Sequence, residues 1–259
     1  MAEKTVGFIG GGRVARIILD GFQKAGRMPA SVVASDTHAD VLKHLKAKFP
    51  SVETALDNNR EAAGHDLVFL GLHPPALAGA LGEIRDSLKP GATVISLAPK
   101  WSIAKMTQTL GGFDRIVRFI PNAASIIGQG YNPIAFSQTL GGQDREEIRS
   151  LVKALGKCPE VAEEKLEAYA VIIAMGPTYL WFQLHELHTM AESFGLSADE
   201  TVTGLTEMVK GAVKTLFGSG LSAEEVMDLI PVKPLGEDEA AIRASYRARL
   251  EPLYRKLKN

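Results

Sequence analysis

The 259-residue sequence contains a single cysteine, Cys158, so no disulfide can form within the chain. A lone thiol is typical of proteins from reducing compartments, and it predicts a cytoplasmic location. No apolar run reaches the ~20 residues that a membrane-spanning helix needs. The formal net charge at pH 7 is only -1, which gives no electrostatic reason to expect binding to nucleic acid or to an anionic membrane.

The sequence also lacks internal repeats, low-complexity segments and a recognisable signal peptide. Hydrophobic residues make up 46% of the chain and charged residues 23%, which is ordinary for a globular protein, and the length fits two domains. Cys158 is followed directly by a proline, at the expected end of an element. We therefore expect a buried and unreactive thiol there rather than a nucleophile.

A glycine-rich stretch near the start of the sequence carries the strongest functional signal. An apolar run over residues 4–9 predicts a buried strand, and the apolar spacing over residues 13–24 predicts a helix. Between and just inside them, Gly10, Gly12 and Ala15 form the pattern G-x-G-x-x-A. In this strand–helix context the pattern predicts a dinucleotide-binding turn.

Each position of this pattern has a physical role. Gly10 permits a tight turn out of the strand, Gly12 lets a pyrophosphate approach the backbone, and Ala15 lets the helix lie close to the sheet. Arg13 and Val14 begin the helix, whose free N–H groups and positive dipole end attract phosphates. All five residues are therefore assigned to a cofactor site.

The residues after a second expected strand, at 31–35, bear on which nucleotide binds. An acidic residue here binds the ribose 2′-hydroxyl of NAD, whereas hydroxyl or basic groups receive the 2′-phosphate of NADP. Asp36 favours NAD, while Ser35, Thr37 and His38 favour NADP. Asp36 is equally well explained as the N-cap of a helix over residues 39–49.

Strands alternate with helices as far as residue 157, with further strands expected at 66–72, 93–97, 115–120 and 133–137. This alternation predicts an α/β domain over residues 1–157, with a doubly wound sheet of the Rossmann type. Ligands bind such sheets at the carboxyl ends of the strands. We therefore assign Leu72, His73, Pro74 and Ala98, which follow two of the strands, to the cofactor site.

Residues 158–259 show long helical patterns and no convincing strand, which predicts an all-helical second domain. Its helices carry apolar stripes that are broader than a small bundle needs, as over residues 199–217. Pairing of two chains into a homodimer or a larger homo-oligomer would cover these stripes, although core packing within one chain leaves the same pattern.

Taken together, these motifs resemble the pyrroline-5-carboxylate reductase family over most of the chain. Residues 7–12 with Ala15 resemble its opening motif, and residues 115–122 resemble its Arg-x-Met-Pro-Asn segment. Residues 72–75 are similar to its Val-Lys-Pro-Gln, residues 94–98 to its next strand and loop, and residues 176–179 to its Gly-Pro-Ala-Tyr. The resemblance implies an oxidoreductase that transfers hydride to a small cyclic imine, usually from NADPH, and that pairs through its helical domain.

The sequence departs from the family in its helical half. The family's Ser-Gly-Ser before Gly-Pro is replaced by Ile173-Ala174-Met175. Its Thr-Ser-Pro-Gly-Gly-Thr-Thr substrate loop falls near residues 230–237, which read Ile-Pro-Val-Lys-Pro-Leu-Gly-Glu. Two prolines there remove N–H donors that a substrate carboxylate would use. His73 stands where the family has a lysine, and His185 stands at an acidic position.

Reduction of an iminium needs mainly orientation and exclusion of water, whereas a carbonyl substrate also needs an acid. The candidate catalytic residues are Thr178, Tyr179 and His185 on one expected helix, and Asn122 after a strand. Tyr179 is better explained as a packed ring, whereas Asn122 is equally well explained as a turn residue. His185 and His188 are spaced by three rather than four residues, so no metal site is expected.

Two functions are compatible with the sequence. The first is an NAD(P)H-dependent oxidoreductase acting on a small imine, with NADP(H) favoured by the resemblance and NAD(H) possible through Asp36. The second is a non-catalytic sensor or scaffold of the same family that binds dinucleotide. The glycine pattern and Pro121-Asn122 favour the enzyme, and the altered residues 230–237 favour the sensor.

Overall fold

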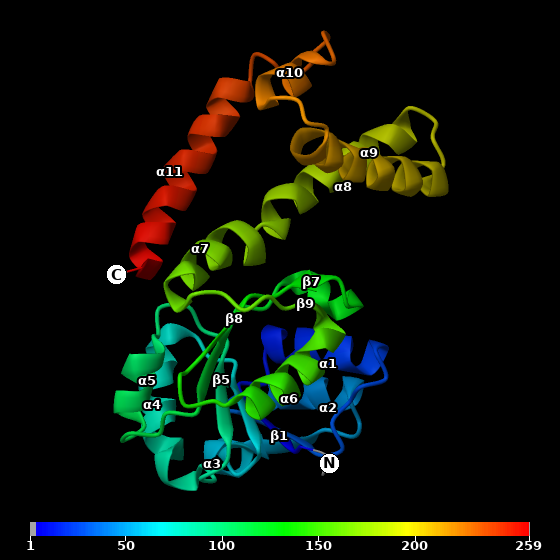
Figure 1. The fold of residues 1–259 in the computed structure, drawn as a ribbon. Helices are drawn as coiled ribbons and strands as arrows, with labels where there is room; N and C mark the ends of the chain where they lie inside the picture. Colours follow the sequence, from blue (N-terminus) through cyan, green and yellow to red (C-terminus); the bar gives the residue numbers. More distant parts are fainter. Residues whose placement is uncertain (1–3, 259) are drawn as a thin grey trace. The chain divides into compact units, whose positions relative to one another are not determined.

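The computed structural model describes residues 4–258, which form two compact units (Figure 1). The first unit runs to Met175 and also includes the chain from Tyr254 onward, and the second is Gly176–Leu253. This division lies later than the expected boundary at 157/158. The reason is packing: Leu166 and Ala170 are buried against Ile120 and Ala135 at one end of the sheet, within the first unit.

The first unit is built on a seven-stranded sheet in the order β3-β2-β1-β4-β5-β6-β8. Strands β1 to β6 are parallel, and β8 is antiparallel to β6. The strand order reverses between β1 and β4, which is the switch point of a doubly wound sheet. The strands are β1 (Val6–Ile9), β2 (Val32–Asp36), β3 (Glu53–Leu56), β4 (Leu67–Leu70), β5 (Thr93–Ser96), β6 (Ile116–Phe119) and β8 (Ile134–Phe136).

Helices cover both faces of this sheet, as Figure 1 shows. Helices α1, α2 and α6 bury apolar residues on one face, where the rings of Phe8 and Phe69 stack with centroids 4.9 Å apart. Helices α3, α4 and α5 pack on the other, around Leu81 and Met106. The helices are α1 (Arg13–Lys24), α2 (Ala39–Lys48), α3 (Asn59–Ala63), α4 (Pro74–Ile84), α5 (Ile103–Thr109) and α6 (Gly142–Val152).

Shorter elements complete the first unit. A two-stranded parallel ladder joins β7 (Gly130–Tyr131) and β9 (Gly156–Lys157). After it come the 3-10 turn η4 (Glu163–Lys165), helix α7 (Leu166–Tyr169) and the π-helical turn η5 (Ala170–Ala174). The remaining 3-10 turns are η1 (Arg85–Ser87), η2 (Ala123–Ile127) and η3 (Lys153–Leu155). Burial raises the pKa of the Cys158 thiol to about 11, so the thiol stays protonated and unreactive at neutral pH.

The second unit is helical, with α8 (Pro177–Ser193), α9 (Ala198–Gly218), α10 (Ala223–Asp228) and most of α11 (Glu239–Lys258). Ser197 and Ser222 start α9 and α10 with capping boxes. Between Gly176 and Leu253, all of which the structure describes, Thr201 alone is buried. The predicted fold, a Rossmann-type sheet followed by a helical region, is confirmed, but the helical unit contains no apolar core of its own.

None of the helices within residues 4–258 is long and apolar enough to cross a membrane.

Strand β1 approaches its neighbours so closely that it tolerates no side chain at Gly7. A Cβ added there would lie 1.9 Å from the carbonyl oxygen of Ala62 in α3. Gly79 on α4 is the matched opposite case, because an added Cβ would meet nothing within 4 Å.

We expect Gly7→Ala to lower the free energy of unfolding by about 1–3 kcal/mol, because α3 must move away from the sheet. Gly79→Ala should raise the free energy of unfolding by up to about 1 kcal/mol, because alanine favours the helix. Urea unfolding of the two variants measures both effects. Equal stability of the two variants would contradict the close packing of β1 and α3.

Candidate functional site

The turn between β1 and α1 lies at the carboxyl edge of the sheet, at its switch point. Gly10 has a φ of +97°, and an added Cβ would lie 2.8 Å from the carbonyl oxygen of Gly71. Both the left-handed conformation and the close approach to β4 therefore require glycine. A Cβ added to Gly12 would instead meet nothing within 4 Å, so the space above this residue is open.

The N-terminus of α1 can receive an anion. Gly12 is its N-cap, no described side chain caps it, and its first turn holds no acidic residue. Arg13 and Val14 are the first two residues of α1. Their N–H groups have no carbonyl acceptor within the helix, because no helical turn precedes them. Ala15 is fully buried and keeps α1 close to the sheet. These residues fit the pyrophosphate of a dinucleotide, through free N–H groups and a positive helix dipole.

Asp36 ends β2 beside this turn. One carboxylate oxygen, Oδ2, accepts the N–H of Gly11 at 3.0 Å, and Oδ1 accepts the N–H of His38 at 2.9 Å. His38, not Asp36, is the N-cap of α2, so the alternative explanation of Asp36 as a helix cap is wrong. The carboxylate is held next to the glycine turn, where Rossmann folds bind the adenosine ribose.

Ser35 does not lie at this site. Its side chain is fully buried, and its hydroxyl donates to Oδ1 of Asn59 at 2.7 Å. Neighbouring residues of a strand point to opposite faces of the sheet. Ser35 therefore points toward α3, away from the face to which Asp36 points. Contrary to the expectation from the sequence, we leave Ser35 out of the cofactor site proposed below.

The loops after β4 and β5 lie along the same edge. A Cβ added to Gly10 would lie 3.2 Å from the Cδ2 atom of Leu72. The loop after β4 therefore lies against the glycine turn. His73 is exposed and is the N-cap of α4, with Pro74 as the first helical residue. Ala98 is buried just after β5, and its N–H donates to Oγ of Ser96.

Asn122 lies after β6 and uses both ends of its amide within the fold. Its Oδ1 accepts the N–H of Ala124 at 2.9 Å, and its Nδ2 donates to the carbonyl oxygen of Ile173 at 2.8 Å. The side chain therefore caps η2 and ties the end of β6 to the π-helical turn. These bonds support the structural interpretation of Asn122, and a contact with substrate stays a prediction.

The candidates on α8 line two different cavities of the helical unit. Thr178 and Tyr179 line a largely apolar cavity of about 660 Å³ between α8 and α11. The ring of Tyr179 meets that of Tyr246 edge-on at 6.0 Å, and burial, followed by the neighbouring Tyr246, raises the pKa of the Tyr179 phenol. His185 lines a cavity of about 530 Å³ between α8 and α9. The helical unit by itself does not bring Tyr179 and His185 together.

Sequence reasoning missed a buried arginine at this edge of the sheet. Arg118 of β6 has a side chain only 3% exposed, and it pairs with Glu163 and Glu167. These partners lie 45 and 49 residues further along the chain, so no local pattern connects them. The available signal was a charged residue inside an otherwise apolar strand, because arginine is rarely buried without a partner.

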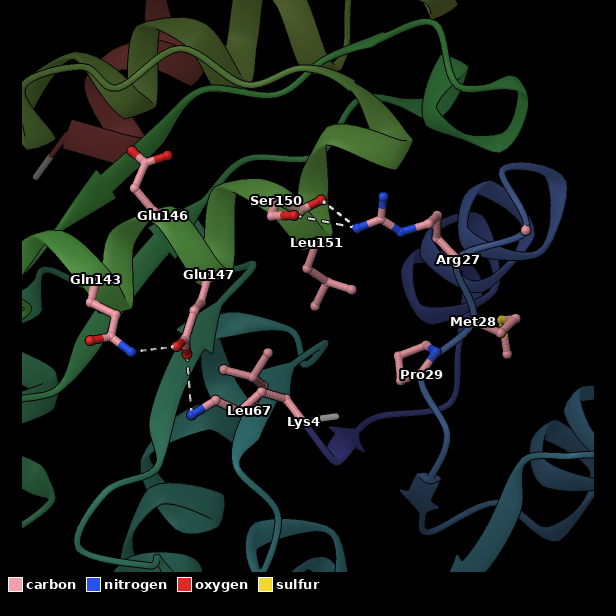
Figure 2. Close-up of a pocket in the computed structure, with 11 residues that line it drawn as sticks. Lys4, Arg27, Met28, Pro29, Leu67, Gln143, Glu146, Glu147, Ser150 and Leu151 are labelled. Carbon is pink, nitrogen blue, oxygen red and sulfur yellow. Dashed lines mark hydrogen bonds and ion pairs between the residues drawn. The ribbon is translucent and has the colours of Figure 1, made fainter. Parts of the chain in front are cut away.

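A separate cavity of about 630 Å³ lies at the opposite, amino edge of the sheet (Figure 2). Lys4, which precedes β1, pairs there with Glu147 of α6 at 3.3 Å, and Arg27 donates to Oγ of Ser150 at 3.3 Å. The cations of Lys4 and Arg27 are thus both paired with other residues that line this cavity. Because ligands bind doubly wound sheets at the carboxyl edge, this cavity is not the candidate active site.

Comparison with known proteins connects the chain with one group of enzymes. Residues 5–100 match the family described as NADP oxidoreductase coenzyme F420-dependent. The chain is 25% identical to pyrroline-5-carboxylate reductase of Methanosarcina acetivorans, over 95% of this chain and 94% of that protein. It is 27% identical to the solved pyrroline-5-carboxylate reductase of Coxiella burnetii, with a TM-score of 0.69 over 99% of this chain and 95% of that one.

The chain is thus similar to pyrroline-5-carboxylate reductases over nearly its whole length, at 25–27% identity. Its fold is also that of Plasmodium falciparum pyrroline carboxylate reductase, solved with NADP bound. The TM-score is 0.81 over 100% of this chain and 98% of that one, at 19% identity. In the segment of residues 230–237, Ile230, Val232 and Leu235 are each at least two-thirds exposed.

We expect Gly12→Val to fold normally and to lose nucleotide binding. The open space at Gly12 accommodates the new side chain, which then occupies the position of the pyrophosphate. Isothermal calorimetry should show at least about a tenfold loss of affinity for NAD(P)H, or about 1.4 kcal/mol. Gly91→Val, in an exposed turn where an added Cβ also meets nothing within 4 Å, is the control and should bind normally.

Proposed function

We propose that this chain is an NAD(P)H-dependent oxidoreductase that reduces a small imine, with 1-pyrroline-5-carboxylate as the first substrate to test. The observation that carries the proposal is the open turn at Gly10–Gly12 beside the carboxylate of Asp36. The family of the chain supports the same chemistry, because its relatives are named pyrroline-5-carboxylate reductases. A bound reduced nicotinamide would supply the hydride.

The residues of the chain would divide the work along its length. In the proposed division, residues 1–157 bind the cofactor, and residues 158–259 bind the substrate and pair with a second chain. The N–H groups at the start of α1 would bind the pyrophosphate, and the loops at His73 and Ala98 would border the nicotinamide half. Thr178, Tyr179, His185 and Asn122 remain the candidates for contact with substrate.

Tyr179 has the property that such a contact requires. A tyrosine hydroxyl is protonated at neutral pH and can donate a hydrogen bond, and burial raises the pKa of this phenol further. An iminium already carries its proton, so the protein needs to orient it and exclude water rather than supply an acid.

The helical unit supports pairing with a second copy of the chain. It has no apolar core of its own, and large apolar side chains are exposed on α8 and α9, including Phe182 at 68% and Phe217 at 81%. A second copy carries the same unpartnered faces, so pairing two copies covers both. We propose a homodimer or a larger homo-oligomer formed through the helical unit.

The oligomer predicts a specific response to charge. Phe182→Glu places a carboxylate in the proposed interface, and we expect it to shift the protein to monomers or to unfold the helical unit. Leu56→Glu is the matched control, because Leu56 is also more than half exposed but lies on β3, outside the helical unit. Analytical ultracentrifugation distinguishes the species. A wild-type protein that is monomeric at micromolar concentration would refute the interface.

Asp36 bears on the choice of nucleotide. The family description and the NADP-bound relative favour NADPH, whereas a carboxylate at the ribose favours NADH and repels a 2′-phosphate. We expect Asp36→Ser to raise the ratio of NADPH affinity to NADH affinity by about tenfold or more. Fluorescence titration of both nucleotides measures this ratio, which cancels any general change in the turn. An unchanged ratio would place the ribose elsewhere.

The reaction itself is tested by adding 1-pyrroline-5-carboxylate to protein and NAD(P)H and following the loss of absorbance at 340 nm. We expect turnover by the wild-type chain and none by Gly12→Val. Tight nucleotide binding without turnover of this or other small imines would support the alternative, a sensor or scaffold, which the exposed apolar residues of the 230–237 segment favour. A chain that binds neither nucleotide would refute both functions.

A further inference from the structure

A buried ion pair lies at the carboxyl edge of the sheet, where α7 packs on the end of β6. The Nη2 atom of Arg118 donates to Oε1 of Glu167 at 2.5 Å, and its Nη1 donates to Oε1 of Glu163 at 3.2 Å. The Nε atom of Arg118 is buried without a hydrogen-bond partner among the described residues. Such pairs contribute little net stability, because the desolvation of two charges offsets their attraction.

The same two carboxylates also hold the loop between β5 and α5, residues 97–102. Oε1 of Glu167 accepts the N–H of Lys100 at 3.2 Å, and Oε1 of Glu163 accepts the N–H of Ile103 at 2.7 Å. Lys100 has a φ of +75°, a left-handed conformation that is strained for a residue other than glycine. Such strain persists only where the surrounding structure enforces it. Here the enforcing contacts are carboxylates that a buried arginine holds in place.

The loop between β5 and α5 lies where the nicotinamide half of a bound dinucleotide is expected. Asp36 at the end of β2 marks the ribose of the adenine half, and the start of α1 marks the pyrophosphate. A dinucleotide that crosses the switch point from β2 places its other half over the ends of β4, β5 and β6. The loop after β5 therefore borders the nicotinamide half.

We propose that Arg118, Glu163 and Glu167 are positioning residues, which hold the strained β5–α5 loop in the shape that receives the nicotinamide half of the dinucleotide. This inference rests on the proposed function. It requires the ion pair to affect the nicotinamide half and not the adenine half. It also requires Lys100 to be the residue through which Glu167 acts.

The test compares ligands that differ only in nicotinamide: NADPH with 2′-phospho-ADP-ribose, and NADH with ADP-ribose. Glu167→Gln keeps the size of the side chain but removes the charge that faces Arg118. We expect calorimetry to show about a fivefold loss of affinity for NADPH and NADH, and unchanged affinity for the two ligands without nicotinamide. A merely structural role would weaken all four ligands alike.

A second substitution tests the route through Lys100. Glycine adopts a φ of +75° without strain, so Lys100→Gly removes the need for an enforcing contact. Added to Glu167→Gln, it should restore most of the lost nicotinamide-dependent affinity. Failure of this rescue, or an equal loss for all four ligands, would overturn the proposal.

Two further results separate this proposal from the function on which it rests. If Glu167→Gln does not fold, Glu163→Gln replaces it, because the Glu163 side chain is 31% exposed and its loss should cost less stability. We expect Glu163→Gln also to lose affinity for NADPH and NADH, but by less than Glu167→Gln. If the wild-type chain binds none of the four ligands, the proposed function is refuted, whereas unchanged binding by both variants refutes only the positioning role.

Discussion

The close approach of backbone to backbone around β1 determines where this molecule can bind a ligand. Gly7 lies against the backbone of α3, and Gly10 lies against Gly71 at the end of β4. Because no side chain intervenes, the turn into α1 is narrow, and a Cβ added to Gly12 would meet nothing within 4 Å. Asp36 is oriented by a bond to this same turn, through the N–H of Gly11. The geometry of the proposed cofactor site thus follows from contacts that only glycine allows.

The two compact units are stabilised in different ways. In the first, apolar residues fill both faces of a mostly parallel sheet. In the second, Thr201 is the one buried residue between Gly176 and Leu253, a range that is described throughout. The apolar faces of the helical unit are therefore largely exposed within this chain. The substrate candidates on α8 belong to this exposed helical unit.

Much of the fold could be predicted from the sequence, because long apolar runs and helical spacing carry it. Strand β3 and helix α3 could not, since three of the four β3 residues are exposed and α3 has only five residues. The sequence predicts that the end of β2 belongs to the cofactor site, but it does not show which of Ser35 and Asp36 faces the glycine turn. Ser35 points inward to Asn59, while Asp36 bonds to a glycine 25 residues earlier. The partners of Arg118 are equally remote, so only the folded chain brings them together.

The most direct test of the account is a crystal structure of the protein grown with NADPH or NADH. The account predicts pyrophosphate oxygens within hydrogen-bonding distance of the N–H groups at the start of α1, and an adenosine ribose beside Asp36. A nucleotide bound elsewhere, such as the cavity beside Lys4 and Arg27, would contradict it.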